Sequence, residues 1–181
     1  MPKITLQTGD ISRFSGDAIV VHSDIELTNT HTNRSIEKIL EKGGPDLIRE
    51  ASAIGYCEIG NVVRTNGYNL KVQHVIFLPY TDNNNPENTI DFVLLHQSLR
   101  AVFTMATLYN VGTLAIPLFR PKWKRKSFKE KLLHLDILDI LFDNTYEETF
   151  REIEIEDIIM GVSPEFDKQS LQEVVVYKRF M

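Results

Sequence analysis

The sequence contains one cysteine in 181 residues, so no disulfide can form within the chain. The neighbours of Cys57 supply no base or metal-ligand partner at a useful spacing. We therefore expect this thiol to be buried and structural rather than a nucleophile. A cytoplasmic location is the default expectation for such a chain.

Long apolar runs are also missing. No stretch of about 18 apolar residues occurs, so no membrane-spanning helix and no membrane partner are expected. The first ten residues, MPKITLQTGD, lack the apolar segment of a secretory signal. Hydrophobic residues make up 43% of the chain and charged residues 25%, as in an ordinary globular protein. We expect a single domain over residues 1–181.

Motifs for metals, cofactors and common nucleophiles are absent as well. Nine glycines are too sparse to form a Walker or GxGxxG loop, and no serine lies in a GxSxG turn. The histidines lack HxxxH or HxH spacing; they are His22, His31, His74, His96 and His134. We therefore expect no metal and no cofactor.

Charge is distributed unevenly along the chain. Residues 120–131 contain seven basic residues and one acid, a local charge of +6. Because the net charge is −5, the remainder carries −11, and residues 136–157 contain nine acids and one arginine. Such asymmetry bears on binding partners more than on fold.

Hydrophobic periodicity predicts alternating strands and helices. The strands are expected over 3–8, 17–21, 59–65, 73–79, 114–118 and 155–162. The helices are expected over 33–42, from Pro45 to a stop at Gly55, over 88–110 with Gly112 closing it, and over 129–142. This order predicts a three-layer α/β/α fold with a mixed, mostly parallel central sheet.

The C-terminal segment has conflicting signals. Ser163-Pro164-Glu165 is a favourable helix start, with a capping serine, a proline at the first position and an acid in the first turn. Val174-Val175-Val176-Tyr177, in contrast, favours a strand within 173–180. We favour a helix that begins at Pro164.

Several short motifs, taken in order, resemble the macro domain family, which binds ADP-ribose. They are Gly9-Asp10-Ile11, Asp17-Ala18-Ile19-Val20, Leu27, Gly43-Gly44-Pro45, the spacing of Gly55, Cys57 and Gly60, Thr65-Asn66-Gly67-Tyr68-Asn69-Leu70, Val75-Ile76 and Leu114-Ala115-Ile116-Pro117. The resemblance covers residues 4–118, and beyond that, over 119–181, it is only architectural. It implies a site at the carboxyl ends of the strands.

The resemblance implies a role for Asp10 in binding adenine. A carboxylate only accepts hydrogen bonds, so it selects an exocyclic amino group. The alternative is that Asp10 caps its own turn. Ile11 would offer its backbone and apolar side chain to the base, and Phe166 is the candidate aromatic to cover it, although Phe166 is equally suited to the core.

The ribose and phosphate loops depart from the family pattern. Residues 21–35 read VHSDIELTNTHTNRS and contain no glycine, so backbone amides cannot approach a diphosphate closely. The usual asparagine positions fall on Val21 and Asp24. Asp24 could bond ribose hydroxyls, while His22 and His31 are weak candidates for catalysis or ordinary solvated residues.

The second loop replaces small residues with cations. Phe119, Arg120, Pro121, Lys122, Trp123 and Lys124 stand at its start. Side-chain cations pair with phosphate oxygens, and Trp123 offers a stacking surface. The alternative is a solvated basic loop with Trp123 packed against the core.

We therefore expect a divergent macro domain that binds ADP-ribose, a related adenine nucleotide or an ADP-ribosylated partner, with little or no catalysis. One alternative is an ADP-ribosyl hydrolase that removes ADP-ribose from a modified macromolecule. Another is a nucleic-acid, polyanion or protein-interaction module that uses the basic loop 120–131, although the net negative charge opposes it.

Overall fold

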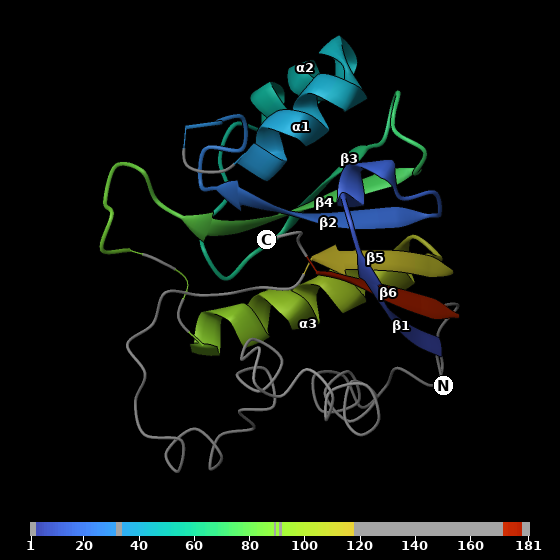
Figure 1. Ribbon diagram of the computed structural model, residues 1–181. Coiled ribbons are helices and arrows are strands. Elements are labelled where there is room, and N and C mark those ends of the chain that lie inside the picture. Colours follow the sequence, from blue (N-terminus) through green and yellow to red (C-terminus); the bar gives the residue numbers. More distant parts are fainter. Residues whose placement is uncertain (1–2, 32–33, 89, 91, 118–171, 179–181) are drawn as a thin grey trace.

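The computed structural model describes residues 3–31, 34–88, 90, 92–117 and 172–178. A six-stranded sheet lies between two helical layers (Figure 1). The strands are β1 (Lys3–Thr8), β2 (Ala18–Asp24), β3 (Val63–Asn66), β4 (His74–Thr81), β5 (Thr113–Pro117) and β6 (Glu173–Lys178). The helices are the 3-10 turn η1 (Ile11–Arg13), α1 (Arg34–Gly43), α2 (Pro45–Ile54) and α3 (Phe92–Leu108).

The strand order is β1-β6-β5-β2-β4-β3. Only β3 runs antiparallel to its described neighbour, β4, and the other described pairs are parallel. The expected mixed, mostly parallel sheet is confirmed. Because parallel strands end at the same edge, the carboxyl ends of β1, β2, β4 and β5 lie on one side of the sheet.

Each face of the sheet carries its own core. Ala18 and Val20 of β2 face α3, whereas Ile19 and Val21 face α1 and α2. All four side chains are buried, which explains why this strand reads as an unbroken apolar run. The same alternation continues in β4, where Phe77 is fully buried on the α1 and α2 side.

The C-terminal helix that we favoured is wrong over 173–178, where the chain forms β6 between β1 and β5. Val174 packs into the α3-side core and Val175 into the opposite one, so apolar burial on both faces selects a strand. Pro164 and the elements expected over 129–142 and 155–162 lie outside the described residues.

Other boundaries also differ from expectation, and β2 continues to Asp24 beyond the expected end at residue 21. The strand expected over 59–65 is the shorter β3, and α3 ends at Leu108. Asn110, rather than Gly112, adopts the left-handed conformation after this helix, with φ of 52°. The amide of Val111 donates to the carbonyl of Ala106, a backbone bond typical of a helix end.

Among the residues that the structure describes, no helix is both long enough and apolar enough to cross a membrane.

Candidate functional site

Asp10 follows the carboxyl end of β1 and begins the turn η1. Gly9 before it has φ of 151°, a conformation that favours glycine. The amide of Ser12 donates to Oδ1 of Asp10 at 2.9 Å, so the carboxylate caps the turn. Ile11 beside it is half-buried against the core on the α1 and α2 side.

The two oxygens of Asp10 have different surroundings. Oδ1 accepts both the amide and the hydroxyl of Ser12, the latter at 2.7 Å. Oδ2 faces the ammonium groups of Lys42 at 3.5 Å and Lys38 at 3.8 Å. Both distances exceed those of strong charged hydrogen bonds, about 2.7–2.9 Å. Oδ2 therefore has room to accept a short hydrogen bond from a ligand.

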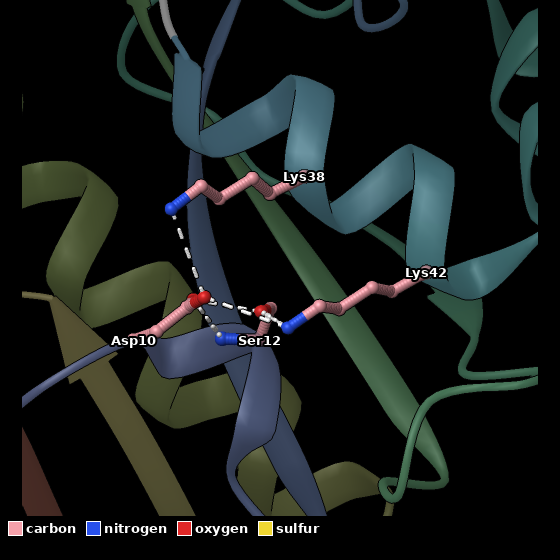
Figure 2. A network of polar contacts seen from close by, with 4 residues as sticks. All are labelled: Asp10, Ser12, Lys38 and Lys42. Carbon is pink, nitrogen blue, oxygen red and sulfur yellow. Dashed lines mark hydrogen bonds and ion pairs between the residues drawn. The ribbon is translucent and has the colours of Figure 1, made fainter.

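The two lysines come from α1, one helical turn apart, and both side chains reach toward η1 (Figure 2). The side chain of Lys42 is held in position, because its Nζ donates a hydrogen bond to Oγ of Ser12 at 2.7 Å. The hydroxyl of Ser12 thus accepts from Lys42 and donates to Asp10. The result is a compact cluster with one anion and two cations.

Electrostatics keep Asp10 ionised. Burial raises the pKa of its carboxyl, but the Ser12 hydrogen bonds and the charges of Lys42 and Lys38 together lower the pKa below its usual value. Tyr177 of β6 lies nearby, and burial together with the charge of Asp10 raises the pKa of its phenol. The ring of Tyr177 packs edge-on against Phe14 at 6.1 Å.

Asp24, the residue that the sequence suggested could bond ribose hydroxyls, lies among hydrogen-bond donors of the protein itself. Its side chain is fully buried at the end of β2. Oδ1 accepts from the Asn83 amide at 2.8 Å and the Thr81 hydroxyl at 3.0 Å. Oδ2 accepts from the Glu26 amide at 3.2 Å and the Asn29 side chain at 3.4 Å. This carboxylate therefore joins the two loops that follow β2 and β4.

The two histidines of the same region, His22 and His31, have different surroundings. His22 stacks on Tyr80, with ring centroids 5.1 Å apart and nearly parallel planes. His31 is exposed, and its amide donates to the Asn29 side chain at 3.1 Å. The stacked ring of His22 suits packing at the end of the sheet, and the position of His31 suits a solvated loop.

The remaining expected site residues lie outside the described part of the chain. They are Phe119, Arg120, Lys122, Trp123, Lys124 and Phe166, together with the whole basic loop 120–131. Their roles stay predictions. Among the described residues, no cluster of three or more His, Cys, Asp or Glu is arranged to hold a metal ion.

Sequence reasoning missed three residues of the cluster around Asp10: Ser12, Lys38 and Lys42. A signal for the lysines was present, because residues four apart share one face of a helix. Their partner, however, is about 30 residues earlier in the chain, and only the packing of α1 against η1 and β2 brings them to it.

A family model described as the Macro domain matches residues 31–130, more than half of the chain. The chain belongs to the macro domain family. This confirms the family that the motif order indicated, and it extends the match into the segment after β5 that had been only architecturally similar.

Relatives of this macro domain include O-acetyl-ADP-ribose deacetylase 1 of Pantoea vagans (strain C9-1). It is 26% identical over 125 residues, which are 65% of this chain and 69% of that protein. The macro domain of ganglioside induced differentiation associated protein 2 superposes with a TM-score of 0.64 and 20% identity over 97% of this chain and 76% of that one.

A macrodomain from Trypanosoma brucei, solved in complex with ADP-ribose, has a TM-score of 0.65 and 16% identity. The match covers 98% of this chain and 64% of that one. At these identities the likeness establishes the macro domain fold, while function has to be argued from the site.

Proposed function

We propose that this macro domain binds ADP-ribose or a related adenine nucleotide, with the adenine amino group donating to Asp10. The observation that carries the proposal is the state of Oδ2 of Asp10. The carboxylate is oriented by Ser12 and kept ionised by Ser12 and the two lysines. Among the described residues, the contacts of Oδ2 are the long ones to Lys38 and Lys42. Ile11 would then border the base.

Two features indicate weak binding with little or no turnover. The loop after β2 lacks the glycines that let amides contact a diphosphate, so part of the usual phosphate binding is missing. Asp24 is engaged by four donors and buried, which leaves it poorly placed to act on a ribose or a water. We expect a dissociation constant in the micromolar range or weaker.

Isothermal titration of the full chain with ADP-ribose tests the proposal. We expect saturable binding that ADP competes for, together with a higher melting temperature when the ligand is present, because a ligand that binds the native state stabilises it by mass action. An absence of binding at millimolar ADP-ribose would remove this ligand from the account.

A second candidate function is hydrolysis of an ADP-ribose derivative. The name of the Pantoea vagans relative, O-acetyl-ADP-ribose deacetylase 1, favours it. Incubation of the protein with O-acetyl-ADP-ribose or with an ADP-ribosylated protein, followed by measurement of released acetate or ADP-ribose, tests it. No release above the uncatalysed rate would leave binding as the function, and release would make His22 and His31 the first residues to substitute.

The positive charge of the basic loop 120–131 supports a second role, the binding of a negatively charged macromolecule. We propose an ADP-ribosylated protein or a nucleic acid as its partner, within a single 1–181 domain and a cytoplasmic setting. Simultaneous reversal of Lys124, Arg125 and Lys126 to glutamate should abolish salt-sensitive retention on nucleic acid. Retention that is unaffected by the reversal would contradict this role.

A further inference from the structure

The Asp10 cluster places a hydrogen-bond acceptor and a charged donor side by side. Oδ2 of Asp10 is the acceptor, and Nζ of Lys42, 3.5 Å away, is the donor. Both have unused capacity: Oδ2 has no short partner among the described residues, and the ammonium has three hydrogens, of which Ser12 takes one at 2.7 Å and Oδ2 of Asp10 a second at 3.5 Å, which leaves a third. The separation allows both groups to reach neighbouring atoms of one base edge.

Purine edges present two complementary patterns. A 6-aminopurine such as adenine offers an amino donor beside the N1 acceptor, whereas a 6-oxopurine offers an O6 acceptor beside an N1–H donor. An isolated carboxylate accepts only, so it binds the first pattern and repels the O6 of the second. A carboxylate beside an ammonium also accepts the second pattern, because the carboxylate accepts from N1–H while the ammonium donates to O6.

Lys42 is suited to this task because it is held in place. Its Nζ donates to Oγ of Ser12 at 2.7 Å, and Ser12 in turn donates to Asp10, so the three side chains keep a common geometry. Lys42 is also the less exposed of the two lysines, at 40% of the side chain against 61% for Lys38. Less ordering is then needed when a ligand binds.

We infer that the Asp10–Lys42 pair makes this macro domain accept 6-oxopurine nucleotides as well as adenine nucleotides. This inference rests on the proposed function, which places the base beside Asp10. With adenine, Asp10 accepts from the amino group, a bond that does not require Lys42. With hypoxanthine, Lys42 donates to O6 and Asp10 accepts from N1–H.

Lys38 provides a matched comparison. It brings the same charge to the same carboxylate oxygen, but from 3.8 Å. Its Nζ forms no hydrogen bond with Ser12 among the bonds seen in the described residues. Its removal therefore changes the local charge without removing the positioned donor.

The experiment titrates ADP and inosine diphosphate into the full chain by calorimetry. The variants are Lys42→Met, Lys42→Arg and Lys38→Met, each checked for an unchanged melting profile. In the wild type we expect inosine diphosphate to bind less than about tenfold more weakly than ADP. A lost charged hydrogen bond typically costs about tenfold or more in affinity, so Lys42→Met should raise this ratio by about that factor.

Lys42→Arg should keep the ratio near the wild-type value because it keeps a charged donor, and Lys38→Met should also leave it nearly unchanged. The inference is overturned if the wild type binds ADP and prefers it by about tenfold or more, or if Lys42→Met leaves the ratio unchanged. Those results leave adenine binding itself intact. If neither nucleotide nor ADP-ribose binds, the proposed function fails and the base preference fails with it.

Discussion

Replacement of Asp24 by alanine should destabilise the fold rather than merely weaken a ligand site. Four donors converge on this fully buried carboxylate: two lie in the loop after β2, one is the last residue of β4, and one lies in the loop that follows β4. The shortest bonds are those from Asn83 and Thr81, at 2.8 and 3.0 Å. Without the carboxylate, both donors lose their partner at the end of the sheet.

The magnitude follows from those two bonds. A buried donor left without its partner costs about 1–3 kcal/mol. Asn83 is exposed and Thr81 is half-buried, so water can reach both after the loops relax, and the lower part of the range applies. We expect Asp24→Ala to lower the free energy of unfolding by about 2–4 kcal/mol. Asp24→Asn, which keeps Oδ1, should cost about 1 kcal/mol.

Urea unfolding of the three proteins, followed by far-ultraviolet circular dichroism, measures these differences. Asp82→Ala is the matched control, because Asp82 lies in the same loop and bonds the nearby amides of Asn84 and Asn85. That control should change stability by about 1 kcal/mol or less. A loss below about 1 kcal/mol for Asp24→Ala would refute the structural role of this carboxylate.

Two further predictions concern pH and packing. Burial and the charge of Arg64, whose Nε donates to Nδ1 of His74 at 2.9 Å, lower the pKa of His74 below its ordinary 6.5. The unfolded chain then binds more protons than the folded chain, so the free energy of unfolding is highest above pH 6.5 and decreases as the pH drops below it. Urea unfolding at pH 7.5 and 5.5 measures this decrease. At Gly67, an added Cβ would lie 1.9 Å from the Val72 carbonyl oxygen, so Gly67→Ala should cost about 1–3 kcal/mol in the same assay.

For both predictions, His74 and Gly67, a specific result would contradict the reasoning. The carboxyl of Asp10 titrates well below this window because its pKa is lowered from 3.8, so it does not mask the histidine. If His74→Gln shows the same pH dependence as the wild type, His74 is not its source. Wild-type stability in Gly67→Ala would show that the turn widens without cost.

The central strands could be predicted from the sequence because their burial is local information. The strands expected over 73–79 and 17–21 contain the unbroken apolar runs 75–79 and 18–21, and such runs suit a sheet covered on both faces. The C-terminal strand was missed for the opposite reason. Cap and proline signals around Pro164 describe how a helix starts, whereas β6 forms because Val174 and Val175 fit between β1 and β5.

The site was only half predictable. The Gly9-Asp10-Ile11 motif predicted an acceptor for adenine, and this role stays a proposal. The structure shows that Asp10 caps its turn through Oδ1, which is the alternative that the sequence had left open. The partners Lys38 and Lys42 depend on tertiary packing and could not be assigned. For Asp24, sequence alone cannot say whether a carboxylate points to a ligand or to its own loops.

Binding of ADP-ribose to the wild type and to Asp10→Asn tests the account most directly. The asparagine keeps an oxygen for the Ser12 amide, so the turn stays capped, but it presents an amino group where Oδ2 stood. We predict that calorimetry shows a roughly 10–100-fold loss of affinity with an unchanged melting temperature in the absence of ligand. Equal affinity of the two proteins for ADP-ribose would contradict recognition of the base by Asp10.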